Sequence, residues 1–216
     1  PRVGALLDPD TERILALKPD LVATYGSQAD LQAQMKRAAI ATYDYRHGGL
    51  AHILVTIREL GDRTAHAADA RQVIAGIESR MAAVTARVAG KPRPRTLLVF
   101  DRDPASLRNI YVSAGRGFLH DMLNVAGGQD AFADVSRESM QATTETILAR
   151  APEVILEVRG GDMPGALAAD MQAWSRLASV PAVRNKRVYF LTGSQIMVPG
   201  PRVAEGIEAM AKVLHP

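Results

Sequence analysis

Two segments of the chain repeat one pattern of apolar and polar positions. They are TERILALKPDLVATYGS, residues 11–27, and TETILARAPEVILEVRGG, residues 144–161. In each copy a threonine, Thr11 or Thr144, is placed to cap a short helix. A proline, Pro19 or Pro152, then forces the chain out of helical geometry, and an apolar run follows. The repeat predicts two similar lobes, each with parallel strands buried beneath helices.

A long helical pattern lies between the two copies. From residue 64 to residue 88, apolar residues recur three or four positions apart: Val73, Ile74, Ile77, Met81, Val84 and Val88. The pattern predicts one amphipathic helix of roughly 37 Å, because a helix rises 1.5 Å per residue. Gly90 and Pro92 end it. We therefore expect an N-terminal lobe at 1–63, a bridging helix at 64–90 and a C-terminal lobe at 91–216.

Apolar runs and helical patterns alternate in the rest of the chain. Strands are predicted at 95–100 and 186–191, a helix over 117–128, and a terminal helix that begins near Pro201. Strands that alternate with helices are typical of the α/β fold class.

Composition excludes several classes of function. The chain has 216 residues with a net charge of +3, and its aromatic content is only 5%. Because the basic residues are interspersed with acidic ones, we do not expect nucleic-acid binding. The absence of cysteine excludes disulfides, thiolate metal sites and iron–sulfur cages. The chain contains no run of eighteen apolar residues, so no membrane-spanning helix is predicted.

The stretch NIYVSAGRGFLHDMLNVAGG, residues 109–128, resembles a phosphate loop but lacks its chemistry. No Lys-Ser or Lys-Thr pair follows Gly117, and His120 stands where a dinucleotide fingerprint needs glycine. Gly115 and Gly117 are therefore expected to form a tight turn that presents Arg116. Arg116 is either a ligand for a carboxylate or phosphate group, or an exposed turn residue. Catalytic G-x-S-x-G and H-E-x-x-H motifs are also missing, so we expect no enzyme activity, no cofactor and no metal site.

The order of these segments resembles the periplasmic solute-binding proteins for cobalamin and iron chelates. The resemblance rests on ILALKPDLVATYGS, the long helix, YVSAGRGFLHDMLNVAGGQDAFADV, SMQATTETILARAPEVILE and VPAVRNKRVYFL, followed by GPRVAEGIEAMAKVLHP. It implies two Rossmann-like α/β lobes joined by a single long helix, with a ligand cleft between the lobes. It also implies a monomeric periplasmic protein that delivers its ligand to the permease of an ABC importer. Members usually begin with a signal peptide and a strand–helix unit, and we expect the first lobe here to lack that unit.

Ligands of open α/β sheets bind at the carboxyl ends of the strands, which selects the candidate contacts. They are Tyr25, Tyr43, Tyr45 and Arg46 in the first lobe, and Arg102, Tyr111, Arg116, Arg159 and Met197 in the second. Tyrosine stacks on flat macrocycles and arginine grips carboxylates. The set suits cobalamin, another corrinoid, haem or a ferric siderophore, so that cobalt or iron would come with the ligand. Haem would need an axial ligand such as Tyr43, Tyr45 or His47.

The resemblance also implies surface acids that dock onto arginines of the permease. Asp30 is the candidate in the first lobe and Asp170 in the second, while Trp174 is expected in the core. Two alternatives remain open: a two-lobed α/β enzyme, and a cytosolic sensor that binds a tetrapyrrole-like ligand.

Overall fold

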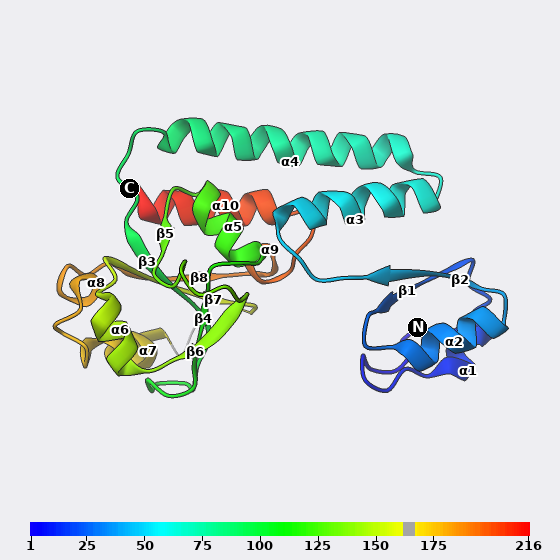
Figure 1. Cartoon of the computed structure of the whole chain (residues 1–216), viewed down its shortest axis with the longest axis horizontal. Coiled ribbons are helices and arrows are strands. Elements are labelled where there is room, and N and C mark those ends of the chain that lie inside the picture. Colours follow the sequence, from blue (N-terminus) through cyan, green and yellow to red (C-terminus); the bar gives the residue numbers. More distant parts are fainter. Residues whose placement is uncertain (162–166) are drawn as a thin grey trace. The chain divides into compact units, whose positions relative to one another are not determined.

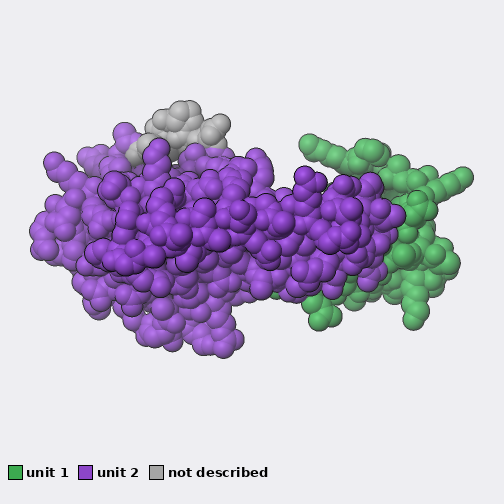
Figure 2. Space-filling model, turned by 90° about the horizontal axis from the view of Figure 1, so that it is seen from above, with its two compact units in different colours: residues 1–47 green, residues 48–216 purple. Residues whose placement is uncertain are grey.

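The chain divides into two compact units in the computed structural model, which describes residues 1–161 and 167–216. Unit 1 is Pro1–His47 and unit 2 is Gly48–Pro216 (Figure 2). Residues 48–63, which the sequence pattern assigned to the first lobe, therefore pack with unit 2. None of the described helices combines the length and the apolar character that a membrane-spanning helix needs.

Unit 1 is a small parallel sheet with helices. Its elements are α1 (Thr11–Ala16), β1 (Leu21–Tyr25), α2 (Ala29–Arg37) and β2 (Ala41–Tyr45). The two strands run parallel, with Leu21 opposite Ala41 and Tyr25 opposite Tyr45. Ile14, Leu31 and Met35 form the buried core of this unit. The register brings the carboxyl ends of both strands to one edge.

Unit 2 contains a mixed sheet. Its strands are β3 (Arg95–Asp101), β4 (Ile110–Ser113), β5 (Gln129–Asp130), β6 (Ser139–Ala142), β7 (Val154–Arg159) and β8 (Val188–Thr192). The order is β6-β4-β3-β7-β8, and β5 pairs with the beginning of β3. The prediction of parallel strands holds for β3, β5, β7 and β8, but β4 is antiparallel to both its neighbours. The connection from β3 to β4, residues 102–109, is too short for a crossover helix, so β4 must turn back.

Helices cover both faces of this sheet (Figure 1). One face packs against α5 (Phe118–Val125), α9 (Ser194–Met197) and α10 (Val203–Leu214), and the other against α6 (Thr144–Arg150), α7 (Leu167–Ser175) and α8 (Pro181–Arg184). Helices α3 (Leu50–Arg63) and α4 (Ala67–Val88) extend the first core, because both pack against α5 and α4 also packs against α10. Strand β7 shows why both faces are apolar. Leu156 and Val158 point into the first core and Ile155 into the second, because alternate residues of a strand face opposite sides.

The long helix α4 is continuous from Ala67 to Val88, close to the predicted span. It does not stand alone, because α3 ends just before it and packs against it. A Cβ atom on Gly61 would lie 2.4 Å from the Cβ of Ala70, so this glycine lets the two helices approach closely. On α4, Arg80 donates two hydrogen bonds of 2.8 Å to Glu208 of α10. The assignment of α4 as a bridge between lobes stays a prediction.

The repeated helix–strand unit is confirmed as α1–β1 and α6–β7, but its caps lie one residue earlier than predicted. Asp10 caps α1, its carboxylate accepting from the backbone N–H of Arg13 at 2.9 Å. Thr143 caps α6: its hydroxyl accepts from the N–H of Thr146 at 3.2 Å, and the Thr146 hydroxyl accepts from the N–H of Thr143 at 3.0 Å. Thr11 and Thr144 are the first helical residues instead.

Replacing Thr143 by alanine is expected to lower the free energy of unfolding by about 1 kcal/mol, because the cap loses its side-chain oxygen. Thr144→Ala is the matched control and should change it by less than about 0.5 kcal/mol. Urea denaturation followed by circular dichroism measures both. Equal effects of the two variants would contradict the assigned cap.

Candidate ligand-binding site

Two tyrosines meet at the carboxyl edge of unit 1. Tyr25 ends β1 and Tyr45 ends β2, and their ring centroids lie 5.8 Å apart with the planes tilted by 42°. Tyr25 is 37% exposed and Tyr45 is half-buried. The pair follows from the parallel register, which places these two residues opposite each other. An accessible aromatic pair of this kind offers a flat ligand two faces for stacking.

The two other candidates in unit 1 differ in accessibility. Tyr43 is only 5% exposed, so it leaves a ligand little surface to contact. Arg46 follows β2 and is well exposed, with its Nε 3.5 Å from the Asp44 carboxylate. Of the predicted first-lobe contacts, Tyr25, Tyr45 and Arg46 are therefore the accessible ones.

A buried cluster of charged side chains lies at the carboxyl ends of β3 and β7 in unit 2. Arg102 follows β3, Glu157 and Arg159 belong to β7, and Asp170 belongs to α7. The Nε of Arg102 lies 3.0 Å from Glu157 Oε2, and its Nη2 lies 3.0 Å from Asp170 Oδ1. The Nε of Arg159 donates to Glu157 Oε1 at 2.9 Å, and its Nη1 lies 2.7 Å from Asp170 Oδ2. Two arginines thus share two carboxylates, and the cluster as a whole is neutral.

Burial separates the two arginines. The side chains of Arg102, Glu157 and Asp170 are 0%, 2% and 1% exposed, whereas that of Arg159 is 16% exposed. Arg102 also donates to the backbone carbonyls of Asp103 and Ser106 at 3.1 and 2.8 Å. The prediction that Arg102 contacts the ligand is therefore wrong: it is a structural cation, which holds the loop after β3. Arg159 remains the arginine of this cluster that a ligand can reach.

Asp170 is not the surface acid that was predicted for docking. Burial raises its pKa, but the N–H of Ala105, at 2.8 Å, and the charges of Arg159 and Arg102 outweigh this, so its pKa lies below the ordinary value. It is therefore a buried, ionised partner of arginines, and the docking role assigned to it is wrong. Trp174 is buried in the core, as expected, and its Nε1–H donates to Glu157 Oε2 at 2.9 Å.

Three apolar or aromatic side chains lie near the same strand ends. Tyr111 of β4 pairs with Asp101, the last residue of β3, and its exposed ring lies 6.3 Å from the ring of Phe100. Met197 of α9 is close to Gly160, because a Cβ on that glycine would lie 3.9 Å from Met197 Cγ. Tyr111 and Met197 therefore stay candidates for ligand contact.

Gly115 and Gly117 form a tight turn that requires glycine at both positions, as the sequence predicted. A Cβ atom on Gly115 would lie 2.3 Å from the carbonyl oxygen of Ala133, and Gly117 has a φ of +89° that favours glycine. Arg116 is exposed between them, and its backbone N–H donates to the carbonyl of Arg137 at 3.1 Å. The structure leaves the ligand role of Arg116 as a prediction.

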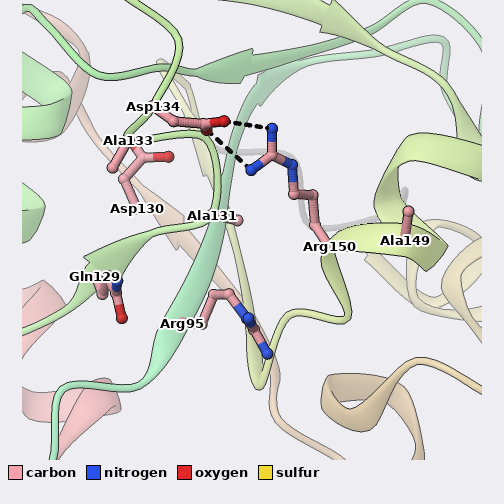
Figure 3. Close-up of a pocket in the computed structure, with 8 residues that line it drawn as sticks. All are labelled: Arg95, Gln129, Asp130, Ala131, Ala133, Asp134, Ala149 and Arg150. Atoms are coloured by element: carbon pink, nitrogen blue, oxygen red, sulfur yellow. Dashed lines mark hydrogen bonds and ion pairs between the residues drawn. The ribbon is translucent and has the colours of Figure 1, made fainter.

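A polar pocket of about 440 Å³ lies at the opposite, amino-terminal edge of the sheet (Figure 3). Arg95 and Gln129, the first residues of β3 and β5, line it together with an ion pair of Arg150 with Asp134, whose bonds are 2.9 Å. Asp130 also lines the pocket. Burial raises the pKa of Asp130, and this effect exceeds the opposite effects of the Phe132 N–H, which donates to its carboxylate, and of the neighbouring His120. The sequence analysis did not predict this pocket, because it considered the residues at the carboxyl ends of the strands.

Across residues 1–161 and 167–216, no three His, Cys, Asp or Glu side chains come together in an arrangement that would hold a metal ion. The accessible candidate contacts are two tyrosines and Arg46 in unit 1, and Tyr111, Met197 and two arginines, Arg116 and Arg159, in unit 2.

The chain was compared with known families and with individual proteins. A family model described as periplasmic binding protein matches residues 1–194. The chain belongs to the periplasmic binding protein family. The relatives described below are named as binding proteins and not as enzymes, in agreement with the prediction of no enzyme activity.

Individual relatives extend over most of the chain. The vitamin B12-binding protein of Salmonella typhimurium is 30% identical over 174 residues, which make up 80% of this chain and 62% of the relative. The chain thus spans less than two thirds of that relative's length. An ABC transporter substrate-binding protein from Listeria monocytogenes matches in structure with a TM-score of 0.83 and 23% identity, over 99% of this chain and 83% of that one. Staphylococcus aureus IsdE complexed with heme matches with a TM-score of 0.76 and 21% identity, over 99% of this chain and 84% of that one.

Glu157 is the one residue of the buried cluster that the sequence analysis did not select. A signal for it exists in the strand VILEV, where a glutamate interrupts an otherwise apolar run. A charge in the middle of a buried strand requires a partner of opposite charge. Arg102 and Arg159 were predicted to contact the ligand, although both are partners of Glu157.

Proposed function

We propose that this protein is a monomeric periplasmic solute-binding protein that delivers cobalamin or a related corrinoid to an ABC importer. The family match over residues 1–194 is the observation that carries the proposal. The relatives named for vitamin B12 and for heme support a large, flat ligand. Tyr25 and Tyr45 provide the rings on which such a macrocycle would stack.

At Arg159, the charges of the buried cluster favour a ligand amide over a ligand carboxylate. Arg102 is buried, and both Arg102 and Arg159 are neutralised by Glu157 and Asp170. A carboxylate ligand gains most from an arginine without a competing anion. A corrinoid carries a ring of neutral amide side chains, whereas haem and many siderophores carry carboxylates. We therefore place cobalamin ahead of haem and of ferric siderophores.

Titration with cyanocobalamin, haemin and several ferric siderophores tests this function. Trp174 is the single tryptophan of the chain and donates to Glu157, so its emission reports on the cluster. Equilibrium dialysis gives the Kd independently of absorption by the ligands. We expect cyanocobalamin to bind most tightly, with a Kd below roughly 10 µM, about −7 kcal/mol. If none of these ligands binds that tightly, the proposed carrier function is wrong; tighter binding of haemin would reassign the ligand.

Docking to the importer requires exposed acids, and the internal repeat provides a matched pair. Glu12 and Glu145 are both exposed in the first turns of α1 and α6. The N–H of Glu145 itself and the Thr143 hydroxyl hold the pKa of Glu145 below its ordinary value, so it is ionised at neutral pH. Asp30 is likewise exposed, in the first turn of α2, and stays a candidate. We propose that Glu12 and Glu145 dock onto basic residues of the permease.

Reversing the charge with Glu145→Lys or Glu12→Lys is expected to weaken binding to the cognate importer by about tenfold, since like charges would then face each other. Affinity for the ligand should not change. Asp20→Lys is the control, because Asp20 is an exposed acid at the other end of the repeated unit, just before β1. Surface plasmon resonance with the reconstituted importer gives the affinities. A loss of equal size in the control would argue for a general charge effect.

A further inference from the structure

The guanidinium group of Arg159 is occupied by carboxylates. Its Nε and Nη2 both contact Glu157 Oε1, and its Nη1 lies 2.7 Å from Asp170 Oδ2. Asp170 in turn is fixed by Arg102 and by the N–H of Ala105, at 3.0 and 2.8 Å. The accessible part of the Arg159 side chain therefore carries a positive charge that the two carboxylates neutralise. Its remaining N–H groups can still donate, since a guanidinium carries five of them.

We propose that Asp170 is a specificity-determining residue, which neutralises Arg159 so that the site accepts an amide and rejects a carboxylate at this position. This inference rests on the proposed function, because it concerns the same ligand site. An amide oxygen accepts a hydrogen bond from Arg159 without added charge. A ligand carboxylate would meet the oxygens of Asp170 and Glu157 in a nearly buried place, where like charges repel strongly.

The acid-to-amide preference of the site is the quantity that tests the proposal. Cyanocobalamin and its isomeric monocarboxylic acids, in which one side-chain amide is hydrolysed, form a matched set of probes. For the wild-type protein we expect every acid to bind no better than the amide. Asp170→Asn removes the competing charge and keeps the shape, so at least one acid should gain about tenfold relative to the amide. Adding Arg159→Gln to this variant should abolish the gain.

Asp134→Asn is the matched control. It also removes an aspartate that pairs with an arginine, Arg150, but at the opposite edge of the sheet. It changes the net charge by the same amount and should leave the preference unchanged. An unchanged preference in Asp170→Asn, or a gain of equal size in the control, would overturn the proposal.

If Asp170→Asn does not fold, or if no corrinoid binds, chemical modification tests whether Arg159 is neutralised. Phenylglyoxal reacts with accessible, unpaired guanidinium groups, and peptide mapping gives the rate at each arginine. In the wild-type protein Arg159 should react at least about tenfold more slowly than the exposed Arg116. Equal rates would show that Arg159 is not neutralised and would overturn the proposal. If protection is found and corrinoids fail to bind, the proposed function falls while the neutralisation of Arg159 stands.

Discussion

Replacing Glu157 by glutamine is expected to lower the free energy of unfolding by about 3–5 kcal/mol, a large part of the stability of a domain. Glu157 is the centre of the buried cluster, because it accepts from Arg102, Arg159 and Trp174. Glutamine keeps the shape but removes the negative charge. Arg102, which is fully buried, would then have Asp170 as its remaining anionic partner among the described residues. A buried charge that loses its counter-charge is costly, since water cannot replace the lost partner.

Urea denaturation measures this loss, with Trp174 fluorescence and circular dichroism as two probes of the same transition. Asp134→Asn again provides the comparison, because its ion pair with Arg150 is at the surface. Exposed pairs contribute about 0–1 kcal/mol, so this variant should lose no more than that. If Glu157→Gln were as stable as the wild-type protein, the cluster would not hold the carboxyl ends of β3 and β7 together.

The repeat in the sequence predicted much of the fold because short-range physics determines it. A proline that follows a helix and precedes an apolar run leaves few conformations open, and both copies form the expected helix and strand. The cap positions differ by one residue. Asp10 and Thr143 stand directly before the threonines that were chosen, and a sequence with two adjacent capping residues does not say which of them begins the helix.

The direction of β4 and the partners of the arginines depend on tertiary contacts. The apolar pattern of Ile110–Ser113 is the same for a parallel and an antiparallel strand, and only the short connection from β3 decides between them.

Arg102 follows a strand and Arg159 ends one, which are positions typical of ligand-binding arginines. Their difference arises because Glu157 and Asp170 reach them from β7 and α7, at separations in sequence that no local pattern encodes.

Replacing both Tyr25 and Tyr45 by alanine is expected to weaken cyanocobalamin binding by about 10- to 100-fold. Stacking of a flat ring system on an aromatic side chain contributes about 1–3 kcal/mol, and tenfold in Kd corresponds to about 1.4 kcal/mol. The two rings lie 5.8 Å apart and Tyr25 is 37% exposed, so they form one accessible aromatic surface. Equilibrium dialysis with purified variants measures the change.

Conservative variants separate stacking from packing and from hydrogen bonding. Tyr25→Phe with Tyr45→Phe keeps both rings, so the affinity should stay within about threefold of the wild-type value if stacking dominates. Tyr43→Phe changes the neighbouring buried tyrosine and should leave the affinity unaffected, since Tyr43 is only 5% exposed. Full affinity in the double alanine variant would place the ligand away from the ends of β1 and β2. A loss in the phenylalanine variant as large as that in the alanine variant would instead assign the contact to the phenolic hydroxyl groups.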